Sequence, residues 1–171
     1  MYRSRNVVFN ICFAINCLLV FSLLFESRLV LPSWLQVAGR MHTLLLHFPI
    51  TLLILYISWS LFMEKRFRAN EPAKNFGDWL LLLSAVTASF TALMGLFLSK
   101  EDGYDTEALQ WHKWSGVAIA ILTSLWYAYR EAIYKNNRLS ISTALISLAL
   151  IIFTGHQGAS ITHGQNYLLA P

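Results

Sequence analysis

Long apolar runs without a single charged side chain dominate this chain. They extend from Asn6 to Phe25, Met41 to Met63, Trp79 to Ser99, Trp114 to Tyr129 and Leu139 to Pro171. An α-helix rises about 1.5 Å per residue, so about 20 residues cross a hydrocarbon core that is roughly 30 Å thick. The first three runs therefore predict transmembrane helices.

For the last two runs, the predicted helix boundaries differ from the ends of the charge-free run. The fourth is long enough only if its helix begins near Ala108, which places His112 and Lys113 in the first turn at the interface. In the fifth, glycines interrupt the pattern from Gly155 onward, and we expect that helix to end near His156. The pattern predicts an all-α integral membrane protein with five transmembrane helices, in which spans 2 to 5 form an antiparallel four-helix bundle.

The first run follows Arg3 and Arg5, as the apolar region of a secretory signal does. It is longer than a normal signal, however, and no A-x-A cleavage site follows it, so we interpret it as a retained anchor. This interpretation divides the chain into an anchor helix with its linker, residues 1–38, and a four-helix membrane domain, residues 39–171.

Composition agrees with this interpretation. The chain is 56% apolar and only 13% charged, whereas a soluble domain carries about a quarter charged residues. These values exclude an ordinary soluble enzyme. The basic residues lie in short clusters between the apolar runs rather than along one stripe, which indicates membrane topology and argues against a nucleic-acid partner.

The distribution of the basic residues predicts the orientation. If the N-terminus lies inside, the inner segments hold nine of the thirteen Lys and Arg residues: Arg3, Arg5, Lys65, Arg66, Arg68, Lys74, Arg130, Lys135 and Arg138. The positive-inside rule then predicts a multi-pass protein of the bacterial cytoplasmic membrane with its C-terminus outside. Asp78 is the acid nearest a span, and we expect it to cap the inner N-terminus of span 3.

With this topology all five histidines fall at the outer end. His42 and His47 lie in the first two turns of span 2, His112 opens span 4, His156 closes span 5 and His163 follows it. Pro49 bends its helix about four residues upstream, between His42 and His47.

Two alternatives stay open for these positions. In span 2, one histidine is a ligand and the other supports it, or the kink turns both inward. His156 and His163 share a helix face if span 5 continues, but a turn at the glycines fits the sequence equally well.

Imidazoles from facing helices form bis-histidine haem b sites in helical bundles. Gly116 and Gly95 belong to stripes of small residues, which allow close helix packing and also clear space for a porphyrin. Our preferred axial pair is His47 with His112, because spans 2 and 4 are diagonal in a simple antiparallel bundle. His156, with His42 or His163, then serves a second haem or supplies supporting hydrogen bonds.

Three segments resemble the DUF2231 family. They are His42-x-x-x-x-His47-Phe48-Pro49, Thr91 to Gly95 with the following His112-Lys113, and Gly155-His156-Gln157-Gly158-Ala159-Ser160-Ile161-Thr162-His163-Gly164. The resemblance covers about Met41 to Pro171. It implies a small bacterial membrane domain that is often fused to planctomycete-type cytochrome c domains, and hence a respiratory redox context with a c-type cytochrome as a domain or as a separate partner.

These observations favour a haem b electron-transfer module between a membrane donor such as quinol and an acceptor on the outer face. A copper or zinc site, with Asp102, Asp105 or Glu107 nearby, is the second hypothesis. A structural anchor for a cytochrome complex is the third. A stand-alone enzyme is least supported, because the sequence contains no Ser-His-Asp set, no H-E-x-x-H motif and no paired intramembrane carboxylates.

Overall fold

The computed structural model describes residues 2–63, 66–67, 70–101 and 107–164. Its elements, in chain order, are α1 (Tyr2–Leu24), η1 (Glu26–Arg28), α2 (Ser33–Gly39), α3 (His42–Leu45), α4 (His47–Ser58), the π-helix η2 (Trp59–Met63), α5 (Glu71–Leu98), α6 (Glu107–Ala128), α7 (Arg130–Lys135) and α8 (Asn137–His163). The all-α prediction is confirmed, since no strand occurs among these residues.

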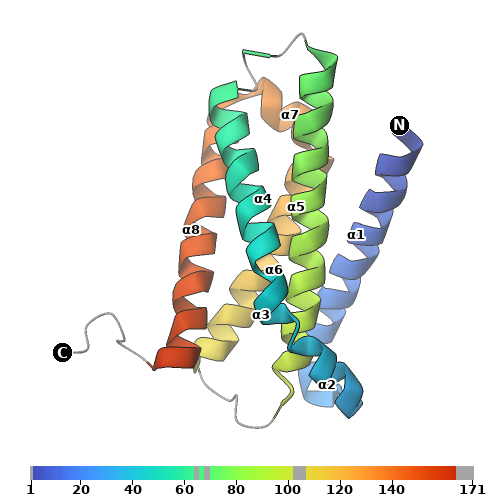
Figure 1. Ribbon diagram of the computed structural model, residues 1–171, viewed down its shortest axis with the longest axis vertical. Coiled ribbons are helices and arrows are strands. Elements are labelled where there is room, and N and C mark those ends of the chain that lie inside the picture. Colours follow the sequence, from blue (N-terminus) through green and yellow to red (C-terminus); the bar gives the residue numbers. More distant parts are fainter. Residues whose placement is uncertain (1, 64–65, 68–69, 102–106, 165–171) are drawn as a thin grey trace, which may run out of the picture.

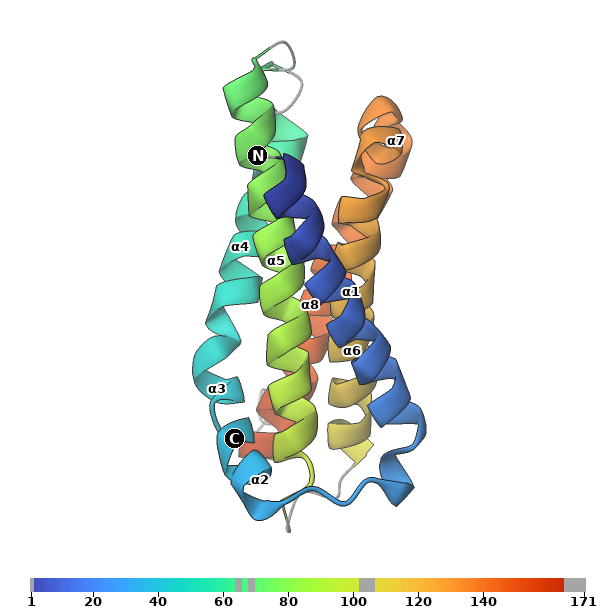
Figure 2. The same cartoon turned by 90° about the vertical axis from the view of Figure 1, so that its right-hand side faces the viewer.

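The long helices lie side by side and alternate in direction (Figure 1). α1, α5 and α8 run one way, and α4 and α6 run the other. α5 packs against both α4 and α6, and α6 packs against α8. α1 packs on the outside of α5 and α6, as the turned view shows (Figure 2). The starts of α3 and α6 and the end of α8 therefore meet at one end of the molecule.

Within the described part of the chain, four segments are long and apolar enough to cross a membrane: Ser4–Leu24, Ser33–Met63, Glu71–Leu98 and Asn137–His163. α6 is not one of these four, although it packs between α5 and α8. The chain is thus a membrane protein with several candidate spans, and the count of five stays a prediction. The expected start of the fourth helix near Ala108 is confirmed, because α6 begins at Glu107.

Two boundary predictions were wrong. α8 continues through Gly155 and Gly158 to His163 and ends only at Gly164, whose φ of 86° is a left-handed conformation that favours glycine. α5 begins at Glu71, where the Asn70 side chain caps the helix by accepting a hydrogen bond from the amide of Ala73. Asp78 therefore lies inside α5 and caps nothing.

Where the bend in span 2 was predicted, one residue, Leu46, separates α3 from α4, and this residue keeps helical dihedral angles of φ −58° and ψ −26°. Proline has no amide hydrogen, so Pro49 leaves the carbonyl of Leu45 without its usual helical partner. The interruption falls between His42 and His47, and the two residues belong to different helices.

α1 contributes to the packed interior. Leu19 and Leu23 of α1 are buried in one apolar cluster with Ala88, Leu96 and Ala120. The amide of Asn16 donates to the hydroxyls of Ser89 and Ser124 at 2.8 and 2.9 Å. Near its N-terminus, Arg5 forms a buried ion pair with Asp78. α1 is thus bound to α5 and α6 along its length.

Candidate cofactor site

The fold brings two of the five histidines into direct contact. The ring centroids of His42 and His112 lie 5.9 Å apart, and the ring planes are nearly perpendicular at 89°. His42 begins α3, and His112 lies near the start of α6, so the pair joins two elements that are far apart in sequence. The other histidines, His47, His156 and His163, are exposed.

The preferred sequence-based pair, His47 with His112, is therefore not the pair that the fold assembles. His42 faces α5 from its own short helix, whereas His47 follows the interruption at Leu46 and starts α4 with an exposed side chain. His156 and His163 lie seven residues apart on one continuous helix and share a face of it. Their assignment to a second haem stays a prediction.

Each paired imidazole is held by a backbone carbonyl. Nδ1 of His42 lies 2.9 Å from the carbonyl oxygen of Thr91, and Nδ1 of His112 lies 2.9 Å from that of Thr154. A carbonyl oxygen only accepts hydrogen bonds, so Nδ1 carries the hydrogen in both rings. Nε2 of each ring then has the free lone pair that binds a metal ion.

A glycine backs each ring. A Cβ atom at Gly95 would lie 2.9 Å from Nδ1 and 3.0 Å from Cε1 of His42. At Gly158 it would lie 3.0 Å from Cε1 and 3.2 Å from Nδ1 of His112. Any larger residue at either position therefore has to displace the ring. Gly116, expected at the site, is more open, since its nearest neighbour would be Cγ2 of Thr154 at 4.0 Å.

The two sets of contacts repeat a short sequence pattern. Phe90-Thr91-x-x-x-Gly95 on α5 and Phe153-Thr154-x-x-x-Gly158 on α8 share Phe, Thr and Gly at the same spacing. In each motif the Thr carbonyl accepts from a histidine on the preceding long segment, and the Gly gives that ring room. The site consists of two helical hairpins, α3–α4–α5 and α6–α8, which contribute equivalent groups.

This repeat is a sequence signal for the backbone groups that hold the two rings, and it was missed because Thr91 to Gly95 and Gly155 to Gly164 were interpreted as separate segments. Alignment on Phe-Thr-x-x-x-Gly singles out the carbonyls of Thr91 and Thr154 and the ring-facing role of Gly158. It does not by itself select His42 over His47.

Charged residues close the same end of the bundle. Lys113, next to His112 in sequence, is buried and forms an ion pair with Glu26, which follows α1. Lys100 also binds Glu26, since its Nζ donates to the backbone carbonyl at 2.7 Å. Arg40 pairs with Glu101 at 2.9 Å. The contacts of Glu26 attach the segment after α1 to the start of α6 and to the residue that follows α5, beside the histidine pair.

Two imidazoles that bind one metal ion from opposite sides, each nitrogen about 2 Å from it, have ring centroids about 6 Å apart. The observed 5.9 Å is close to this value, and with perpendicular ring planes it is equally the separation of a direct edge-to-face contact. Among the described residues no group of three or more His, Cys, Asp or Glu side chains is placed to hold a metal ion. Glu107 instead accepts a hydrogen bond from Trp111, and Asp102 and Asp105 lie outside the described residues.

A comparison with protein families identifies one match. Residues 39–166 match the model of DUF2231, which is described as a predicted membrane protein. No curated protein matches the chain, and no solved structure matches it. The match covers most of the chain and contains the histidine pair, both Phe-Thr-x-x-x-Gly motifs and all helices from α3 to α8. The chain therefore belongs to the DUF2231 family of predicted membrane proteins.

Proposed function

We propose that the chain is a haem b electron-transfer module in which His42 and His112 would hold the haem iron. The observation that carries this proposal is the pair of imidazoles at 5.9 Å, each with Nδ1 bound to a backbone carbonyl. A metal-binding histidine typically donates its second ring nitrogen in this way, which sets its tautomer and orientation.

The number of protein ligands favours haem over copper or zinc. A haem would bring most of the ligands of its iron with it and would need only two imidazoles from the protein. Zinc needs about four protein or water ligands, and the described residues offer no group of three. Two further features of the surrounding residues also fit a haem. Thr154 Oγ1 is a buried polar atom without a hydrogen-bond partner, and Gly95 and Gly158 keep side-chain volume low beside the rings.

In this proposal each protein group has a defined task. A haem b held by these residues would supply one-electron redox chemistry to the site. The carbonyls of Thr91 and Thr154 keep the proton on Nδ1, and the glycines hold the rings close to α5 and α8. The partly buried position of both rings limits access of water.

We further propose the cytoplasmic membrane as the location, with the N-terminus inside and the histidine pair near the outer face. Arg5, Lys74 and Arg130 lie at the opposite end of the bundle, as the positive-inside rule requires for this orientation. An outer-face acceptor such as a periplasmic c-type cytochrome then meets the site directly, and quinol is the proposed membrane donor.

The test is a reduced-minus-oxidised spectrum of the detergent-purified protein, expressed with a supply of haem precursor. We expect Soret and α bands of a b-type haem and about one iron per chain. His42→Ala and His112→Ala should each abolish or shift these bands. His47→Ala is the matched control, since this histidine is exposed, and should keep them. A wild-type protein without haem, or unchanged bands in both ligand variants, would refute the proposal, and stoichiometric zinc or copper would favour the second hypothesis.

A further inference from the structure

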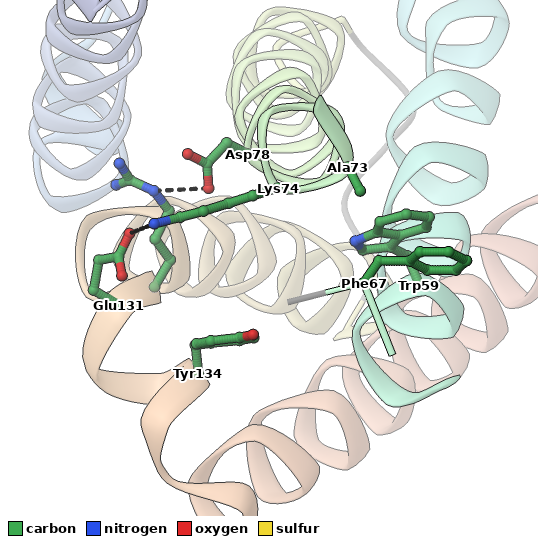
Figure 3. A pocket seen from close by; sticks show the side chains of 8 residues that line it. Trp59, Phe67, Ala73, Lys74, Asp78, Glu131 and Tyr134 are labelled. Carbon is green, nitrogen blue, oxygen red and sulfur yellow. Dashed lines mark hydrogen bonds and ion pairs between the residues drawn. The ribbon is translucent and has the colours of Figure 1, made fainter. Parts of the chain in front are cut away.

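A second polar site lies at the end of the bundle opposite the histidine pair. It is an open hollow between η2, the start of α5 and the corner of α6 and α7 (Figure 3). Its walls are formed by Trp59, Phe67, Ala73, Lys74, Asp78, Arg130, Glu131 and Tyr134. A hollow lined by both charged and aromatic side chains is the place to look for a ligand.

The charges in and beside the hollow do not cancel. Asp78 accepts hydrogen bonds from two arginines at once, Arg5 at 2.5 Å and Arg130 at 3.0 Å. Lys74 pairs with Glu131 at 3.0 Å, and this hydrogen bond lowers the pKa of Glu131, which keeps that carboxyl ionised at neutral pH. The two cations and two carboxylates that line the hollow cancel one another, and Arg5 beside it gives the cluster one net positive charge.

Two of the cations have donors to offer to an anion. Arg130 uses Nε for Asp78 and Nη1 for the carbonyl of Tyr127, and its guanidinium lies 4.3 Å from the centroid of the Tyr127 ring. These contacts orient the guanidinium without using Nη2. The Lys74–Glu131 pair is 45% and 52% exposed, so breaking it to free the ammonium costs little.

The aromatic residues indicate where such an anion comes from. Trp59 begins η2 at the end of the Ser33–Met63 span, and its ring stacks on Phe67 with centroids 6.3 Å apart. Trp and Tyr are enriched where a membrane meets water, which is the level of phospholipid headgroups. Basic pockets between transmembrane helices at this level bind anionic headgroups.

We propose that this hollow binds the phosphate group of an anionic phospholipid, with Lys74 and Arg130 contacting the phosphate and Trp59 and Tyr134 flanking the headgroup. The same cations would attract a free phosphate ion, but the aromatic lining and the position at the end of a membrane span favour the lipid. The site is independent of the histidine pair, which lies at the other end of the bundle.

The experiment measures lipid binding to the intact purified chain by native mass spectrometry. Phosphatidylglycerol and phosphatidylcholine with identical acyl chains are titrated in parallel, and inorganic phosphate is added as a competitor. We expect phosphatidylglycerol to bind about tenfold more tightly than phosphatidylcholine. Equal affinities would overturn the proposal, and full competition by millimolar inorganic phosphate would assign the site to free phosphate instead.

Two variants separate a specific contact from general attraction. Lys74→Gln combined with Glu131→Gln removes one charge of each sign, so the net charge stays the same while the ammonium contact is lost. We expect this double variant to lose most of the preference for phosphatidylglycerol. Lys135→Gln is the control, because this exposed lysine of α7 does not line the hollow. Equal losses in the control and the double variant, or none in the double variant, would show that Lys74 makes no specific contact.

Discussion

At the scale of single residues, Gly95 and Gly158 determine how closely the paired imidazoles approach α5 and α8. A Cβ atom at either position would lie within about 3 Å of a ring that a hydrogen bond also holds in place. Such separations are shorter than normal contacts, and the ring cannot move away without lengthening its bond to the Thr carbonyl. These glycines are therefore positioning residues for the site.

Gly95→Ala and Gly158→Ala should each lower stability by about 1–3 kcal/mol, the usual cost of overpacking. If haem is bound, both variants should also shift its Soret band, because the axial rings move. Gly155→Ala is the matched control, since it lies in the same helix as Gly158 and a Cβ there meets no atom within 4 Å. Alanine favours helix over glycine, so this control should leave stability unchanged or raise it by up to about 1 kcal/mol.

Thermal unfolding of the purified protein and the absorption spectrum provide the measurements. Equal effects of the three alanine variants would show that the glycines do not constrain the rings.

The position of the histidines at one end was predictable from hydrophobic runs and loop charges alone. The choice of His42 as the partner of His112 was not, because it depends on the direction of α3, the short helix before Leu46. It also depends on the Thr91 carbonyl, a backbone group that any residue type supplies. Spacing along a regular helix separates His42 from His47 but cannot indicate which of them meets α6.

At the scale of elements, α1 is joined to the bundle by polar contacts as well as apolar packing. Asn16 lies between α5 and α6 and donates to a serine on each, and the fully buried Cys12 lies in the same cluster. Hydrogen bonds between transmembrane helices are each worth roughly 0.6 kcal/mol, with a maximum near 1.7. The sequence predicted an anchor helix here. It did not predict this packing, because the partner serines, Ser89 and Ser124, are remote in the chain.

Asn16→Ala should therefore loosen α1 before the rest of the bundle unfolds. In a Cys17→Ser background, Cys12 is the only cysteine in the chain, and it is buried. We expect its reaction with a fluorogenic maleimide to begin a few degrees lower in Asn16→Ala, since about 1 kcal/mol corresponds to roughly 2–4 °C for a protein of this size.

Asn10→Ala, at an exposed position of the same helix, is the control and should not change this temperature. If both variants behave like the parent protein, the asparagine does not hold α1.

At the scale of the whole molecule, two hairpins make equivalent contributions to one site. Each begins with a segment that carries a histidine and ends with a helix that carries Phe-Thr-x-x-x-Gly. The paired rings meet between the hairpins, so neither hairpin contains the complete pair. α5 packs along α6, and this contact joins the two halves.

The halves should therefore assemble when they are made as separate chains. Coexpression of residues 1–101 with residues 107–171 should give a complex that co-purifies and, on the proposed function, restores the b-type spectrum. Each half alone should lack that spectrum, because it carries only one of the two ligands. Co-purification without haem would contradict the proposed site while leaving the interface between the hairpins intact, and a complete spectrum from one half would contradict the pairing.

The interruption at Leu46 has a mechanical consequence for this arrangement. A transmembrane helix changes its tilt when bilayer thickness changes. We expect a change in the tilt of α4 to be taken up at the interruption at Leu46, because the Thr91 carbonyl holds His42 to α5. Bilayer thickness should then have little effect on the geometry of the histidine pair.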